Sequence, residues 1–181
     1  MRGDNLPRVS VIGLGYIGLP TAAVIARAGM EVYGVDVSRA VVETINRGEI
    51  HIEEVDLDGL VQGVVQRGLL RAGTEVQPAD VFVIAVPTPF HKDADHTPDL
   101  SYVLAAAGSV AKVLKAGDTI ILESTSPVGT TEQLRDAIAA QRPGPVTGYS
   151  LADGGWRAGS LPTHRGPSHP KSSTIRSRRR C

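Results

Sequence analysis

The feature that most constrains the fold is a glycine motif between an apolar segment and a helical segment. Gly13-Leu-Gly15-Tyr-Ile-Gly18 follows a short β-branched run at 8–12 and precedes a helical pattern at 17–28. In the G-x-G-x-x-G pattern, the first glycine permits a tight turn, the second lets the backbone approach a pyrophosphate, and the third lets the helix pack on the strand. The motif alone is weak evidence, so its surroundings decide what it means.

Those surroundings alternate between strand and helix patterns. Further strands are expected at 31–35, 81–86 and 119–122, and the continuous apolar run at 81–86 is typical of a parallel strand buried on both faces. Helices are expected at 39–46, 57–66 and 100–114, and a further helix with Thr130 or Thr131 as its N-cap should run to about 141. Ser38 is expected as the N-cap of the helix at 39–46, and Gly29 as the stop of the helix at 17–28. Strands separated by helices imply right-handed crossovers. The chain is therefore expected to form an α/β, Rossmann-like, doubly wound parallel sheet.

An acidic residue stands where such a fold would recognise a dinucleotide. Asp36 closes the second expected strand, and a carboxylate there accepts hydrogen bonds from the adenosine ribose and repels a 2′-phosphate. This favours NAD over NADP, although Arg39 could accommodate that phosphate. The pyrophosphate would sit at the N-terminus of the first helix.

Two polar loops should reach the same edge of the sheet. The segments 87–90 and 124–131 each follow an expected parallel strand, and ligands of doubly wound sheets bind beyond the carboxyl ends of the strands. Thr88, Thr125 and Thr131 are candidates to contact the sugars and phosphates of the cofactor, with a turn or cap role as the alternative for each. Glu123 is left open between a contact on the nicotinamide side and a loop-capping role.

Charge and composition divide the chain in two. Seven of its 19 Lys and Arg residues lie from Pro145 onward, against one of its 19 acidic residues, Asp153. We expect an NAD-binding domain at 8–142 and a basic tail at 143–181, which lacks apolar periodicity and is expected to be disordered. No apolar run approaches the roughly 20 residues of a membrane span, and the N-terminus lacks a secretory pattern, so a cytoplasmic location is expected.

Several separated motifs carry a resemblance to known proteins, at 11–20, 34–36, 45–49, 85–89 and 124–131. Together they resemble the UDP-glucose/GDP-mannose dehydrogenase family. Within it, the stretches at 48–53, 87–90 and 123–129 are most similar to the UDP-N-acetyl-mannosamine dehydrogenases. The resemblance covers about 8–142 and implies NAD-dependent, two-step oxidation of a UDP-sugar C6 alcohol to a carboxylate, in polysaccharide biosynthesis. It also implies that NAD contacts Tyr16, Ile17, Asp36, Thr88 and Thr131, and that the intact enzyme is an oligomer.

The same resemblance calls for features that this sequence lacks. The catalytic cysteine of that family lies in a glycine-rich motif far downstream, together with its assisting lysine and asparagine. Here the single cysteine is Cys181, which follows three arginines, so no catalytic residue is assigned. The chain is expected to be a truncated or frame-shifted product that lacks the substrate domain and is inactive alone, and the UDP-sugar would be a partner only of the intact relative.

Other interpretations are weaker. His91 and His96 flank two acids in a polar loop without the rigid spacing of a metal site, so no metal is expected. The arginine-rich end could contact nucleic acid through phosphates, but a solvated tail is favoured. His51 is expected to be structural or a substrate-side contact. The alternatives for function are a dinucleotide-binding module of another NAD-dependent dehydrogenase, or a basic-tailed, non-enzymatic remnant.

Overall fold

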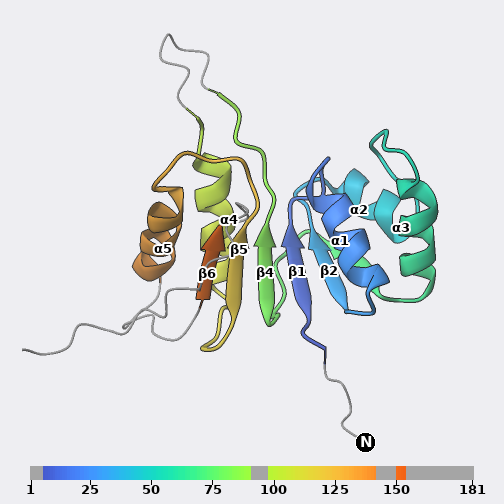
Figure 1. Cartoon of the computed structure of the whole chain (residues 1–181), viewed down its shortest axis with the longest axis horizontal. Helices are drawn as coiled ribbons and strands as arrows, with labels where there is room; N and C mark the ends of the chain where they lie inside the picture. Colours follow the sequence, from blue (N-terminus) through green and yellow to red (C-terminus); the bar gives the residue numbers. More distant parts are fainter. Residues whose placement is uncertain (1–5, 91–97, 142–149, 154–181) are drawn as a thin grey trace, which may run out of the picture.

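A parallel sheet with helices on both faces forms the body of the protein. The computed structural model describes residues 6–90, 98–141 and 150–153. Its six strands lie in the order β3-β2-β1-β4-β5-β6, and every neighbouring pair is parallel (Figure 1). This order is that of the doubly wound dinucleotide-binding fold, so the expected fold class is confirmed. The elements are β1 (Val9–Ile12), α1 (Gly18–Arg27), β2 (Val32–Val35), α2 (Arg39–Asn46), α3 (Leu57–Gln66), β3 (Leu70–Gly73), β4 (Val81–Ile84), α4 (Ser101–Ala111), β5 (Thr119–Leu122), α5 (Thr130–Ala140) and β6 (Ser150–Asp153).

Each face of the sheet has its own hydrophobic core. Helices α1, α2 and α3 contribute to one buried cluster, and α4 and α5 to the other. Successive residues of β4 alternate between them, because Val83 belongs to the first cluster and Phe82 and Ile84 to the second. This alternation explains why β4 reads as continuously apolar, as expected for a parallel strand covered on both faces.

Helix starts and stops follow local chemistry in most places. Ser38 caps α2 as expected, since its side chain accepts a hydrogen bond from the Val41 amide, and Gly29 follows α1 with a φ of 99°. The expected threonine cap of α5 is wrong. Gly129 occupies the N-cap position with a φ of 91°, and the Thr130 hydroxyl donates to the Pro127 carbonyl at 2.8 Å instead.

Two strands were not expected from the sequence. β3 is short and lacks β-branched residues. Its Ala72 amide donates to Asn46 Oδ1 at 2.8 Å, and Asn46 Nδ2 donates to the Ala72 carbonyl at 3.0 Å. β6 extends the sheet beside β5 and corrects the expectation of an unstructured tail for its four residues, 150–153. The rest of the tail from 154, with Cys181, lies outside the described residues.

Candidate functional site

The glycine turn between β1 and α1 lies at the carboxyl edge of the sheet, next to β4. Gly13 has a φ of 91°, and a Cβ atom there would lie 2.7 Å from the Ala85 carbonyl oxygen. A Cβ atom on Gly18 would overlap the Gly13 carbonyl oxygen. Since both obstacles are backbone atoms, only glycine fits at either position. These two glycines are therefore required by the turn itself, whether or not a ligand is present.

Gly15 differs from the other two because the space around it is open. Nothing lies within 4 Å of a Cβ atom built on it, and no φ in the left-handed region restricts it. Helix α1 begins three residues later, and no side chain caps its N-terminus. The neighbouring Tyr16 and Ile17 are exposed. An uncapped helix N-terminus beside an open glycine can accept an anionic group on backbone amides.

Asp36 lies directly beside this turn and supports it. One carboxylate oxygen accepts a hydrogen bond from the Leu14 amide at 3.0 Å, and the other accepts from the Ser38 amide at 2.9 Å. The side chain thereby ties the end of β2 to the glycine turn and to the start of α2. Arg39 is exposed on the first turn of α2.

The loops after β4 and β5 meet at the same edge. The Thr88 hydroxyl donates to the Thr125 carbonyl at 2.5 Å, and the Ser124 hydroxyl donates to the Val86 carbonyl at 2.7 Å. Thr125 itself is exposed, and Thr131 is half-buried in the first turn of α5. Thr88 and Thr125, two of the three candidate threonines, are therefore hydrogen-bonded to each other. Ser124 was not predicted from the sequence, although a hydroxyl at a strand end is the signal that could have identified it.

A side-chain hydrogen bond connects the two halves of the sheet at this edge. The Thr21 hydroxyl of α1 donates to Glu123 Oε1 at 2.9 Å, although the two residues are 102 positions apart. Glu123 follows β5 directly, and its amide donates to the Ile84 carbonyl at 2.9 Å. Glu123 was a candidate from the sequence but Thr21 was not, because nothing in a helical pattern indicates that a threonine contacts a distant loop.

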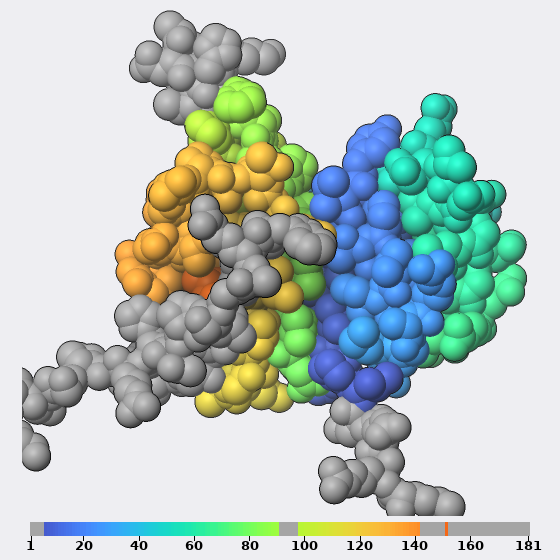
Figure 2. Space-filling model, in the orientation of Figure 1, coloured from blue at the N-terminus to red at the C-terminus, as the bar shows by residue number. Residues whose placement is uncertain are grey.

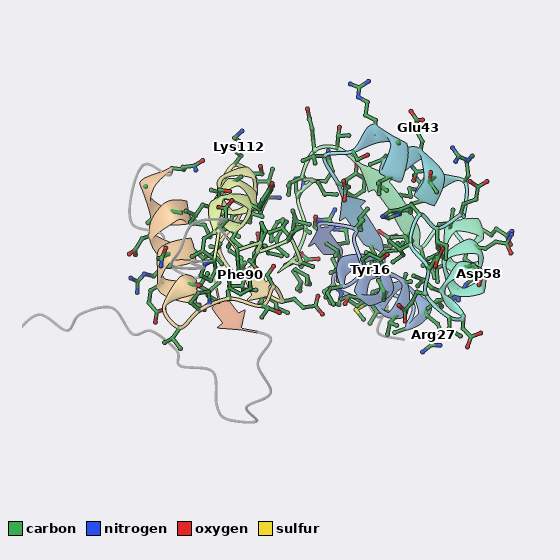
Figure 3. All side chains as sticks on the ribbon, turned by 90° about the horizontal axis from the view of Figure 1, so that it is seen from above. Tyr16, Arg27, Glu43, Asp58, Phe90 and Lys112 are labelled. Atoms are coloured by element: carbon green, nitrogen blue, oxygen red, sulfur yellow. The ribbon has the colours of Figure 1, made fainter. Side chains whose placement is uncertain are left out.

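Apolar side chains stand exposed around this edge. In the view from above, Tyr16 and Phe90 lie in different halves of the molecule (Figure 3). The surface is notched between the N-terminal half and the later half (Figure 2). Val37 and Val128, which follow the second and fifth strands in the loops, are almost fully exposed. The carboxyl edge therefore combines backbone donors, a carboxylate and an apolar rim, which is the composition of a small-molecule site.

Histidines are the remaining candidates from the sequence. His51 is exposed in the loop between α2 and α3. The loop with His91 and His96 is outside the described residues, and the described part holds no group of three or more side chains suited to a metal ion. Within that same part, no helix is long and apolar enough to cross a membrane.

Comparison with known proteins identifies the family of the chain. Residues 7–151 match the NAD-binding domain of the UDP-glucose/GDP-mannose dehydrogenase family. The chain belongs to this family. Its glycine turn and Asp36 therefore lie within the family's NAD-binding domain, and NAD is the cofactor.

Two relatives of this chain are named for N-acetylated sugars. The chain is 61% identical over 135 residues to an NDP-N-acetyl-D-galactosaminuronic acid dehydrogenase of Ralstonia nicotianae, covering 75% of this chain and 31% of the relative. It is 56% identical over 135 residues to the UDP-N-acetyl-D-mannosamine dehydrogenase of Escherichia coli K12, covering 75% and 32%. The chain thus spans about a third of the length of these family members.

Solved structures of the family share the fold. The UDP-N-acetyl-mannosamine dehydrogenase Cap5O of Staphylococcus aureus superposes with a TM-score of 0.75 at 36% identity, over 81% of this chain and 36% of that one. A UDP-D-ManNAc dehydrogenase of Pyrococcus horikoshii gives 0.74 at 37% identity, over 81% and 35%. The expected family and cofactor are confirmed.

Proposed function

We propose that this chain is the NAD-binding part of a UDP-sugar 6-dehydrogenase that oxidises a UDP-N-acetylhexosamine, with UDP-N-acetylmannosamine as the first candidate. The observation that carries the proposal is the open glycine turn beside Asp36, within a domain of this family. The substrate class rests on relatives whose names specify N-acetylated sugars. When bound, NAD would accept the hydride removed from the sugar alcohol.

Two parts of NAD are assigned to residues at this edge, the pyrophosphate and the adenosine ribose. The pyrophosphate would lie on the α1 N-terminus, where the open space at Gly15 admits it and Tyr16 and Ile17 flank it. The adenosine ribose would bond to Asp36. Further contacts are assigned to the remaining candidates at this edge, which are Gly13, Gly18, Arg39, Thr88, Thr125 and Thr131.

Asp36 retains enough hydrogen-bonding capacity for a ribose. A carboxylate offers about four acceptor sites, and the amides of Leu14 and Ser38 use two of them. Two acceptor sites remain for the two ribose hydroxyls. A 2′-phosphate would bring two negative groups together, which disfavours NADP.

The chain matches only the cofactor-binding part of its relatives. The relatives are about three times as long as the matched region. We therefore propose that the 181-residue chain binds NAD without oxidising UDP-N-acetylmannosamine by itself, and that it acts in the cytoplasm.

Calorimetric titration of NAD and NADP into the 181-residue chain tests this proposal, with an NADH-release assay on UDP-N-acetylmannosamine alongside. The expected result is saturable NAD binding, at least about tenfold tighter than NADP binding because of the Asp36 carboxylate, and no NADH release. Absence of NAD binding would contradict the cofactor role. Release of NADH would contradict the proposed inactivity of the chain alone.

Replacing Asp36 by alanine should weaken NAD binding and lower the stability of the domain. The variant loses the ribose acceptor and leaves the amides of Leu14 and Ser38 without partners, so we expect about tenfold to 100-fold weaker NAD binding and about 1–3 kcal/mol lower stability. Calorimetry and urea unfolding measure the two effects. Glu43→Ala, an exposed acid on α2, is the control and should change neither. An Asp36→Ala variant that bound NADP tightly at full stability would show that the carboxylate has only a selectivity role.

A further inference from the structure

The carboxylate of Glu123 has one oxygen that the fold leaves unused. Oε1 accepts the Thr21 hydroxyl, but Oε2 has less than 1 Å² of accessible surface and no hydrogen-bond partner among the described residues. A buried carboxylate oxygen without a donor is unfavourable, because water no longer solvates it. The arrangement therefore requires a donor that the described protein does not provide.

A loop-capping role does not account for this carboxylate. The amides of Glu123 and Ser124 both donate to the Ile84 carbonyl, and the Thr130 amide donates to the Pro127 carbonyl. The loop after β5 thus satisfies these amides with backbone acceptors. The carboxylate of Glu123 instead reaches α1, the helix that begins at the glycine turn.

The position of Glu123 indicates which donor it meets. A dinucleotide spans the two halves of this fold, with one nucleotide on each side of the point where the strand order reverses. Asp36 follows β2 in the first half, so the adenosine would lie there, and the nicotinamide would lie beyond β4 and β5. Glu123 is the first residue after β5. The nicotinamide ring carries a carboxamide, whose NH₂ group is a hydrogen-bond donor.

We infer that Glu123, oriented by Thr21, accepts a hydrogen bond from the nicotinamide carboxamide and thereby positions the ring. This inference rests on the proposed NAD-binding function. The terminal torsion of a glutamate is broad, so a modest rotation of the carboxylate can bring Oε2 toward the ligand. The negative charge of Glu123 also favours the positively charged oxidised ring.

The test compares three ligands on the 181-residue chain by calorimetry. NAD carries the carboxamide, ADP-ribose lacks the whole nicotinamide, and 3-acetylpyridine adenine dinucleotide has a methyl ketone in place of the amide. The variant Glu123→Met removes the acceptor at similar length, and Glu123→Gln retains one neutral acceptor. Glu31→Gln, an exposed glutamate at the opposite end of the strands, is the matched control.

We expect Glu123→Met to weaken NAD binding about tenfold and Glu123→Gln to weaken it less, while ADP-ribose binding changes less than about twofold. The unmodified chain should bind the acetylpyridine dinucleotide about tenfold more weakly than NAD, whereas Glu123→Met should bind the two equally. Thermal melting of each variant shows whether it is folded.

Three outcomes would overturn the inference. Equal losses of NAD and ADP-ribose binding would mean that Glu123 supports the fold and not the nicotinamide. Unchanged NAD binding in both variants would mean that it contacts no cofactor. Failure of the unmodified chain to bind either NAD or ADP-ribose would overturn the proposed function itself, which distinguishes that failure from the first two.

Discussion

Replacing Gly18 by alanine should destabilise the domain severely and abolish NAD binding. The added Cβ atom would overlap the Gly13 carbonyl oxygen, and it would lie 2.9 Å from the carbonyl carbon of the same residue. Side-chain rearrangement cannot relieve this overlap, because both atoms belong to the backbone of the turn. Either α1 moves away from β1 or the turn opens, and both movements disrupt the packing of Leu19 and Ala22 in the first core.

The expected loss of stability can be estimated from substitutions that overpack protein interiors. Forcing a methyl group into a packed interior typically lowers stability by about 1–3 kcal/mol, and an obstacle made of backbone places Gly18→Ala at or above about 3 kcal/mol. The free energy of unfolding of a whole domain is typically about 5–15 kcal/mol. Urea unfolding followed by circular dichroism measures the loss, and NAD titration should detect no binding.

A second glycine provides the control for Gly18→Ala. Gly59 lies within α3, and nothing stands within 4 Å of a Cβ atom built on it. Alanine is favoured over glycine inside a helix, so Gly59→Ala should raise stability by about 0.5–1 kcal/mol. Equal stability of the Gly18→Ala variant and the unmodified chain would contradict the described packing of α1 against the turn.

Local sequence patterns predicted the centre of this fold well. The glycine turn, the Asp36 position and the buried β4 segment each have a local cause: a required backbone conformation, a strand end, or an uninterrupted apolar run. The Ser38 cap is equally local, because a serine hydroxyl bonds to an amide three residues ahead. Such features depend on a few neighbouring residues, and the sequence displays those neighbours directly.

The features that escaped prediction depend on distant partners. β3 contains an arginine and a glycine within four residues, and it is a strand because β2 and the side chain of Asn46 provide its hydrogen bonds. β6 similarly exists beside β5. The Thr21–Glu123 bond joins residues 102 positions apart, so no local pattern could reveal it. The α5 cap was mispredicted because Gly129 takes the N-cap position, and the Thr130 hydroxyl donates to the preceding Pro127 carbonyl.

The candidate site therefore combines residues that the fold itself requires with residues that are free to contact a ligand. Gly13 and Gly18 are fully explained by the turn, and Asp36 is partly explained by two backbone amides. Gly15 has no such explanation. No neighbour crowds it, no left-handed conformation demands glycine there, and yet it lies at the uncapped start of α1. An absent side chain that the fold does not require points to a ligand.

Valine at position 15 should consequently remove cofactor binding without removing the fold. Its side chain would enter open space, so we expect a change in stability of no more than about 0.5 kcal/mol, as for other exposed substitutions. The same space is where the pyrophosphate must reach the backbone amides, so NAD binding should weaken about 100-fold or more. Urea unfolding and calorimetric titration measure the two quantities on one sample.

The ligand series separates Gly15 from Glu123. ADP-ribose contains the pyrophosphate, so Gly15→Val should weaken ADP-ribose and NAD binding equally, whereas Glu123→Met should affect only NAD. Gly63→Val, in open space on α3, is the matched control and should leave binding unchanged. If Gly15→Val kept full affinity for NAD, the pyrophosphate could not lie on this turn, and the second glycine would have to be explained by the fold after all.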